Sequence, residues 1–166
     1  MSKSDLGIVK AKKEERIRNW TERKIKLAHK WIENEDVQKA RPMIQGAIHL
    51  CMLGENVGNE QGGERPVLVI SNNRVNSSSG NVKVIPLTTK LKTKTVKRKG
   101  AERIVPKVAT HYFLKKAKYN FLDKDSAAKV EETTTVSKVR LTAYLGNIDE
   151  SDLPAIKSRL KWLFDL

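Results

Sequence analysis

Residues 54–70, GENVGNEQGGERPVLVI, join a loop of small polar residues to the pattern of a buried strand. The glycines of the loop can adopt positive φ and leave backbone N–H groups open to a ligand. Pro66 cannot donate to a strand ladder and suits the first position of a strand, while Val67–Ile70 is an apolar run typical of a core strand. Arg65 stands between them and places a permanent cation at the mouth of the sheet.

The composition is typical of one domain that attracts polyanions. The chain has 166 residues, enough for a single core, and a formal net charge of +14. Such an excess of Lys and Arg favours nucleic-acid binding through counterion release from phosphates. The single cysteine, Cys51, excludes an internal disulfide and is typical of a reducing compartment. We find no apolar run of ~20 residues and no secretion signal, and we therefore expect a cytoplasmic protein without a membrane partner.

Residues 8–41 have the pattern of one amphipathic helix that ends before Pro42. Four apolar side chains recur at helical spacing among Lys and Arg, namely Ile17, Trp20, Leu27 and Trp31. We expect residues 1–45 to form a basic N-terminal helical extension. The plainer interpretation is a helix packed on the sheet or on a dimer mate, and the alternatives are a basic arm that lengthens an RNA groove or a cover over the active site.

From Gly46 the hydrophobic period changes to two, which is typical of strands. The strands that we expect are 46–52, 67–71, 82–89, 110–115 and 127–136. Pro86 predicts an edge, a bulge or a bend near the end of the third strand. Residues 72–81 have the composition of a hairpin turn. Residues 90–107 are rich in Lys and Arg and predict a mobile loop with room for a short helix or strand inside it, either solvated or acting as a flap that contacts phosphates.

Two short helices are expected near the C-terminus. Ser137 would cap a helix that ends at Leu145, and Ser151 would cap a last helix with one apolar face. A helix followed mostly by strands and then a helix predicts an α+β fold around a small, curled antiparallel sheet.

Residues 60–70, EQGGERPVLVI, resemble the mark of the MazF/PemK toxins, EQGG-x-RPVLVI, and the resemblance extends from Gly46 to the C-terminus. These toxins are small ribonucleases of toxin–antitoxin pairs that work without a metal or another cofactor. The resemblance implies that residues 46–166 form an SH3-like, CcdB-like antiparallel β-barrel with appended helices. It also implies a homodimer and an acidic antitoxin partner whose partly disordered tail lies in the basic groove.

The resemblance also implies the chemistry. In the family, an arginine at the position of Arg65 and a threonine at the position of Thr88 carry the reaction, which leaves a 2′,3′-cyclic phosphate and a 5′-hydroxyl. Because arginine stays protonated, we assign Arg65 mainly to bidentate binding of the scissile phosphate and, as a hypothesis, to proton donation toward the leaving oxygen. Thr88 would hold a non-bridging oxygen or the nucleophile. The general base stays open among Glu60, Glu64, His49, His111 and, more weakly, His29.

We expect three segments to contact single-stranded RNA, whose unstacked bases expose the edges that a protein can read. The residues are Asn59, Glu60, Gln61, Gly62 and Gly63 in the loop, Lys90 and Lys92 for phosphates, and Glu132, Thr133 and Thr134 for base edges. Many family members have Gln and Arg where this chain has Glu132 and Thr134, so the base preference of the family is not carried over. A glutamate there would accept a hydrogen bond from a base amino group and would repel a nearby phosphate.

Two other functions stay open. The CcdB toxins share the fold family and poison DNA gyrase through their C-terminal residues, and Trp162 lies near the end of this chain. A plain RNA-binding module, made inactive by Glu132 or by the N-terminal arm, would bind RNA without cleaving it. The intact EQGG-x-RP loop together with Thr88 favours the nuclease.

Overall fold

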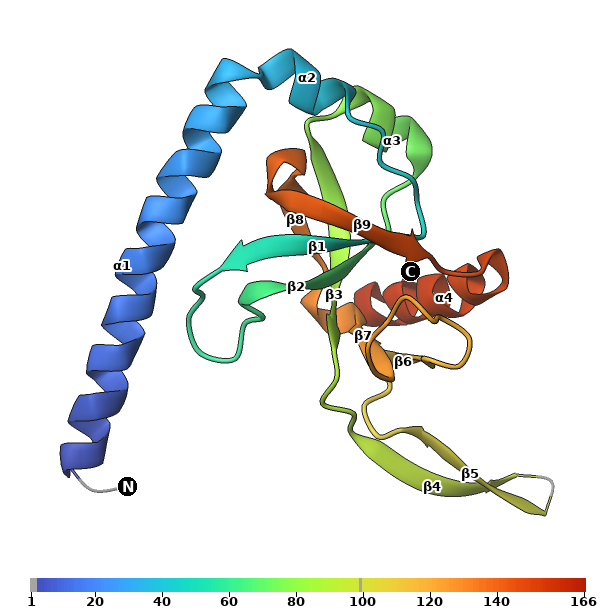
Figure 1. Ribbon diagram of the computed structural model, residues 1–166. Coiled ribbons are helices and arrows are strands. Elements are labelled where there is room, and N and C mark those ends of the chain that lie inside the picture. The colour runs from blue at the N-terminus through green and yellow to red at the C-terminus, as the bar shows by residue number, and fades with distance from the viewer. Residues whose placement is uncertain (1–2, 99) are drawn as a thin grey trace.

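The computed structural model describes residues 3–98 and 100–166, and a long N-terminal helix stands beside an antiparallel sheet in it (Figure 1). Helix α1 spans Lys3–Glu33 and a short α2 spans Glu35–Ala40, which ends before Pro42 as predicted. The single helix predicted over 8–41 is therefore interrupted. The break falls at Asn34, whose φ of −136° is not helical, and α2 turns toward the sheet there.

The sheet confirms the predicted α+β class. Its strands are β1 (Ala47–Gly54), β2 (Gly63–Val69), β3 (Asn81–Thr88), β6 (His111–Leu114), β7 (Ser126–Lys129), β8 (Thr134–Ser137) and β9 (Leu141–Asn147). They pair antiparallel in the order β6-β7-β3-β2-β1-β9, and β8 pairs with β3. Within the described part of the chain the sheet curls without closing into a complete barrel.

Strand β3 changes its partner along its length. Its first half pairs with β8 and its last two residues pair with β7, and Pro86 falls between the two. A proline lacks the N–H that a continuous ladder would use, so it suits the point where one partner ends and the next begins. The single strand predicted over 127–136 is split by a 3₁₀ turn, η1 (Val130–Glu132). This turn carries its two glutamates out of the ladder.

Two predicted loops contain regular structure, although the connection at 72–81 does join the antiparallel strands β2 and β3 as predicted. The predicted turn at 72–81 contains a helix, α3 (Asn73–Ser78), because the Asn72 side chain accepts a hydrogen bond from the Val75 N–H and caps it. The predicted mobile loop at 90–107 contains a hairpin of β4 (Thr93–Arg98) and β5 (Ala101–Pro106), which forms a separate two-stranded sheet and projects from the body (Figure 1).

The helix predicted from Ser137 to Leu145 is not formed, so that prediction was wrong. Only a 3₁₀ turn, η2 (Lys138–Arg140), follows Ser137, and the chain then enters β9. The last helix is present as α4 (Leu153–Phe164), after the turn η3 (Glu150–Asp152). The side chain of Asp149, rather than that of Ser151, caps this turn by accepting from the Ser151 N–H at 2.8 Å.

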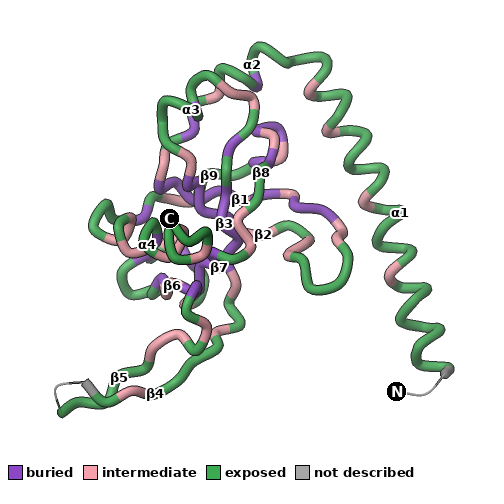
Figure 2. Tube along the Cα trace, turned by 180° about the vertical axis from the view of Figure 1, so that it is seen from behind, coloured by how far each residue is buried: buried purple, intermediate pink, exposed green. Residues whose placement is uncertain are grey.

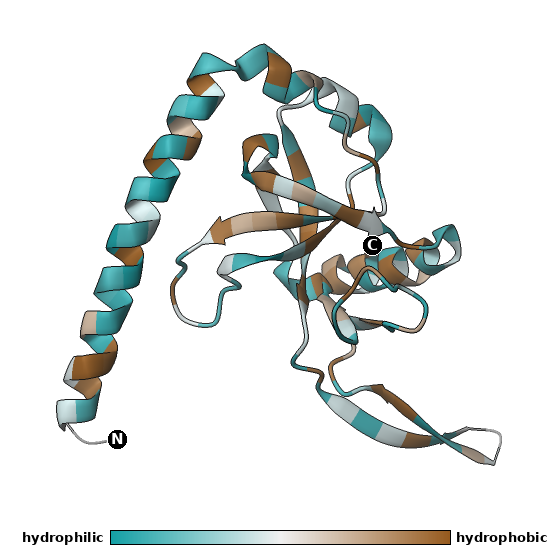
Figure 3. Ribbon diagram, viewed as in Figure 1, coloured by the Kyte–Doolittle hydropathy of each residue, from teal (hydrophilic) through white to brown (hydrophobic). Residues whose placement is uncertain are grey.

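Buried residues gather on the central strands (Figure 2). Neighbouring residues of these strands belong to two different buried clusters. Leu68 and Ile85 belong to the cluster that α4 covers, whereas Val67 and Val69 belong to the other. Helix α1 contributes to neither cluster. Polar residues follow its whole length, while the strands carry long apolar stretches (Figure 3). The sheet and α4 therefore hold the fold, and α1 is an addition at its side.

Candidate active site

The loop before β2 holds the side chain of Arg65 in place. Its Nε donates to the Gly62 carbonyl oxygen at 2.7 Å, and its Nη1 donates to the Gln61 side-chain oxygen. Burial lowers the pKa of Arg65, and the nearby charge of Glu132 opposes that change. A cation that is half-buried and tethered on one side can present its remaining N–H groups to an anion.

Thr88 ends β3 on the neighbouring strand. Its Oγ1 accepts a hydrogen bond from the Lys90 N–H at 3.1 Å, which leaves the hydroxyl hydrogen free for a ligand. Arg65 and Thr88 line one cleft of about 640 Å³, and Lys90 and Lys92 lie at the same cleft. The structure thus brings together both predicted catalytic residues and both predicted phosphate contacts.

A second cleft of about 430 Å³ adjoins the first, because Gln61 and Glu131 line both. It gathers the predicted base-reading residues Glu132, Thr133 and Thr134 with Glu60 of the loop. The other loop residues are placed differently. Asn59 is exposed and lines neither cleft, Gly62 holds Arg65, and Gly63 lines a hollow that faces α1.

His111 is the one predicted base that lines the cleft of Arg65 and Thr88. It is 2% exposed, and its Nε2 lies 2.9 Å from Oε1 of Glu131, whose Oε2 accepts from the Thr110 hydroxyl at 2.5 Å. Burial alone would raise the pKa of Glu131, but the hydrogen bonds from Thr110 and His111 outweigh it and hold that pKa below its usual value. The Glu131 carboxylate is therefore charged at neutral pH.

The remaining predicted bases lie elsewhere. His49 is buried in β1 against the Tyr144 ring, and burial lowers its pKa. Glu64 lines the hollow that faces α1, His29 is exposed on α1, and Glu60 accepts from the Val57 N–H within its own loop at 3.3 Å. Within residues 3–98 and 100–166, no three acidic, histidine or cysteine side chains gather as a metal-binding group. Over the same residues, we find no helix with the length and apolar character needed to cross a membrane.

Residues 44–164 match the family described as PemK-like, MazF-like toxin of type II toxin-antitoxin system. This chain belongs to that family. Among its relatives, the Endoribonuclease MazF of Staphylococcus epidermidis is 33% identical over 116 residues, which cover 70% of this chain and 86% of the relative. The Endoribonuclease MazF of Staphylococcus saprophyticus is 30% identical over 118 residues, which cover 71% and 88%.

Solved structures of this toxin family share the fold. MazF from Deinococcus radiodurans superposes with a TM-score of 0.57 at 18% identity and covers 76% of this chain and 99% of its own. The Mycobacterium tuberculosis toxin MazF-mt6 superposes with a TM-score of 0.53 at 23% identity and covers 72% and 97%. The family match begins at residue 44, after α1 and α2. The predicted division into residues 1–45 and 46–166 stays a prediction.

Among the acidic side chains of the two clefts, Glu132 is paired with a lysine. The Lys129 Nζ lies 3.0 Å from Oε1 of Glu132, and both side chains are mostly buried. Glu132 therefore does not face the cleft as an isolated negative charge, which reduces the phosphate repulsion that the sequence predicts. Sequence reasoning missed Lys129. Its spacing of three from Glu132, within a turn, was the available signal.

Proposed function

We propose that this chain is the toxin of a type II toxin–antitoxin pair and acts in the cytoplasm as an endoribonuclease on single-stranded RNA. The 2′-oxygen attacks the adjacent phosphorus, the bond to the 5′-oxygen breaks, and a 2′,3′-cyclic phosphate and a 5′-hydroxyl result. Relatives at 30 and 33% identity that are named Endoribonuclease MazF support the activity. The observation that carries the proposal is the single cleft lined by Arg65 and Thr88 from adjacent strands.

Arg65 supplies charge where the reaction develops it. The pentacoordinate phosphorus carries more negative charge than the starting diester, and a fixed guanidinium stabilises it more than it stabilises the substrate. Two bonds to the loop hold this guanidinium before substrate binds, so little reorganisation is needed. Burial lowers the pKa of Arg65, which is the direction that assists proton donation to the leaving 5′-oxygen.

Thr88 and Glu131 take the other two tasks in this scheme. The Thr88 hydroxyl accepts from the Lys90 N–H and so directs its own hydrogen toward a non-bridging phosphate oxygen. We assign acceptance of the 2′-hydroxyl proton to the Glu131 carboxylate, which lies in both clefts and is fixed by Thr110 and His111. A carboxylate with a lowered pKa is a weak base, so charge stabilisation by Arg65 supplies most of the rate.

The adjoining cleft is the proposed reader of the bases next to the cleaved bond. Glu132, Thr133 and Thr134 offer acceptors and hydroxyl groups there, while Lys90 and Lys92 meet phosphates. An acidic antitoxin tail is the proposed protein partner, and the net charge of +14 supports it. A structural neighbour with a TM-score of 0.51 is an endoribonuclease in complex with its cognate antitoxin. We also propose that the toxin is a homodimer.

The test is incubation of the purified chain with a long single-stranded RNA in EDTA, followed by mapping of the fragment ends. Arg65→Ala is the test variant, and Arg74→Ala, on the exposed face of α3, is the matched loss of one cation. We expect cleavage at a short recurring sequence with 5′-hydroxyl ends, lost in Arg65→Ala and kept in Arg74→Ala. RNA binding without cleavage would favour the inactive binding module, and cleavage unchanged by Arg65→Ala would reject this active site.

A further inference from the structure

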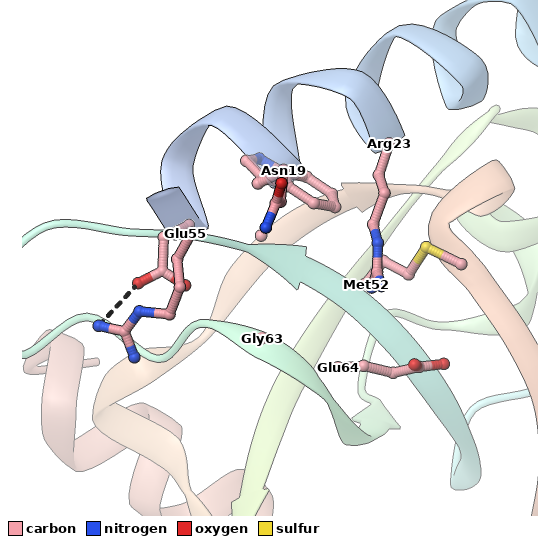
Figure 4. Close-up of a pocket in the computed structure, with 9 residues that line it drawn as sticks. Asn19, Arg23, Met52, Glu55, Gly63 and Glu64 are labelled. Carbon is pink, nitrogen blue, oxygen red and sulfur yellow. Dashed lines mark ion pairs between the residues drawn. The ribbon is translucent and has the colours of Figure 1, made fainter. Parts of the chain in front are cut away.

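Helix α1 contacts the loop that precedes β2. The Lys13 Nζ lies 2.5 Å from both the Glu55 carboxylate and the Asn56 carbonyl oxygen. The Arg16 guanidinium lies 3.4 Å from the same carboxylate, and a dashed line marks this ion pair at Glu55 in Figure 4. Two cations of the helix therefore hold the start of the loop through one side chain and one backbone oxygen.

Trp20 of α1 packs against Gly54, the residue that precedes Glu55. Gly54 has φ of +100°, and a Cβ at that position would lie 2.6 Å from the Trp20 ring, so the indole lies directly against the backbone. Arg140 lies 5.5 Å from the centroid of the same ring and donates to the Leu53 carbonyl oxygen at 3.1 Å. The end of β1 is thus fixed between α1 and η2.

The hydrogen bonds continue from this contact to Arg65. The Asn56 side chain, whose backbone oxygen Lys13 holds, donates from Nδ2 to the Gln61 carbonyl oxygen at 2.7 Å. The Gln61 side chain in turn accepts from Arg65, and the next residue, Gly62, accepts from the Arg65 Nε. The loop is also closed at its neck, because a Cβ on Gly62 would lie 2.6 Å from the Gly54 oxygen. Every step from Lys13 to the catalytic guanidinium is a direct contact.

The position of α1 distinguishes its interpretations. The residues that line the two clefts come from β1, the loop, β2, β3 and the segments after it, and α1 supplies none of those described. The helix therefore does not cover the active site. It also lies outside both buried clusters, so it does not hold the core. Its packed face is instead directed at the loop and at the edge formed by η2.

We propose that α1 positions Arg65, with Lys13 as the positioning residue that fixes residues 55–62 and thereby the guanidinium. Lys13 touches neither substrate nor the reacting atoms, and its effect passes through Asn56 and Gln61. A loop that moves by even ~1 Å would misplace the cation relative to the phosphate and cost as much as ~10²-fold in rate. This inference rests on the proposed function, because it gives α1 a task in the cleavage that Arg65 performs.

The test compares Lys13→Gln with Lys12→Gln, an exposed lysine one residue away that loses the same charge, and with the conservative Lys13→Arg. Two quantities are measured, kcat and KM for RNA cleavage, and hydrogen exchange of the amides at 55–62. We expect Lys13→Gln to lower kcat about tenfold with KM changed less than about twofold, and to speed exchange in the loop. Lys12→Gln should leave kcat and the hydrogen exchange of the loop unchanged, and Lys13→Arg should retain most of kcat.

A second background tests the route. In Gln61→Ala, which removes the side-chain contact to Arg65 and leaves the contact from the Gly62 carbonyl oxygen, Lys13→Gln should lower kcat less than it does in the unmodified chain, because the two changes act on one chain of contacts. Unchanged kcat and exchange in Lys13→Gln would overturn the proposal. So would equal losses in Lys12→Gln and Lys13→Gln with a raised KM, which would make α1 an RNA-binding arm. If the unmodified chain fails to cleave RNA, the proposed function fails, while the exchange data still decide whether Lys13 orders the loop.

Discussion

The sheet body and helix α1 are held in different ways. In the body, side chains such as Ile48, Leu68 and Ile85 are fully buried in one of the two clusters. In α1, even the residues that face the body, Trp20, Leu27 and Trp31, are only half-buried. The helix contacts the loop through Lys13 and Trp20 and contacts Gly80 through Trp31. We infer from this difference that substitutions in one region can be made without disturbing the packing of the other. The body should determine whether the chain folds and reacts, and α1 should determine how well one cation is placed.

The largest expected effect is the loss of kcat when Arg65 of the body is changed, compared with the smaller loss when Lys13 of α1 is changed. Arg65→Lys keeps a positive charge and loses the fork that binds the loop and the phosphate together, so we expect kcat to fall about 10³-fold, far more than for Lys13→Gln. Single-turnover cleavage measures it. A loss of less than tenfold would show that charge alone suffices and that the tethering by the loop is unimportant.

A matched pair of apolar truncations compares stability in the two regions. Ile156→Ala in α4 removes a side chain that is 0% exposed and should lower the free energy of unfolding by about 3 kcal/mol. Leu27→Ala in α1 removes a half-buried side chain and should cost about 1 kcal/mol or less. Urea unfolding measures both. Equal losses would make α1 part of the core and end the distinction.

Thr88→Val tests the second catalytic residue of the body with little change in shape. Because valine cannot donate to a phosphate oxygen, we expect kcat to fall about 10²-fold while the melting temperature stays close to that of the unmodified chain. Thr95→Val, at an exposed position of β4 that lines neither cleft, is the control and should retain activity. A similar loss in both variants would show that the effect is not specific to the Thr88 hydroxyl.

The smallest expected effect is a pH dependence at the start of α4. Burial alone would raise the pKa of Asp152, but hydrogen bonds from Tyr119 and Lys118 outweigh it and lower that pKa from its ordinary 3.8. Its stabilisation is therefore fully present above pH 3.8 and is lost as the pH falls through the lower folded value. Asp152→Asn should cost about 1 kcal/mol at pH 7 and less at pH 3. Urea unfolding at both pH values would contradict this if the cost were the same.

Local patterns could predict the parts of the site that lie within one stretch. The residues GENVGNEQGGERPVLVI predict a loop, an arginine and a strand, and the structure has all three. Alternation likewise predicted β1, and the strands predicted at 67–71 and 82–89 match the second half of β2 and most of β3. Thr88 came from the family resemblance, since a threonine at a strand end carries no signal of its own.

Other features depend on partners far along the chain. The segment after Ser137 has a possible helix cap, but pairing of β9 with β1, including Leu141 opposite Cys51, makes it a strand. The contact between Lys13 and Asn56 joins residues 43 positions apart, and no periodicity in the sequence predicts it. The helix itself was predictable from its spacing, while its task at the loop emerged only from the contacts in space.

The most direct test of the account uses an RNA oligonucleotide that contains one mapped cleavage site, beside the same oligonucleotide with a single 2′-deoxy nucleotide on the 5′ side of the scissile phosphate. Because the 2′-oxygen is the proposed nucleophile, we predict that the RNA is cut to a 2′,3′-cyclic phosphate in EDTA and that the substituted oligonucleotide is bound but not cut. Cleavage of the substituted oligonucleotide at a similar rate would contradict the account, because another nucleophile would then attack the phosphate that Arg65 holds.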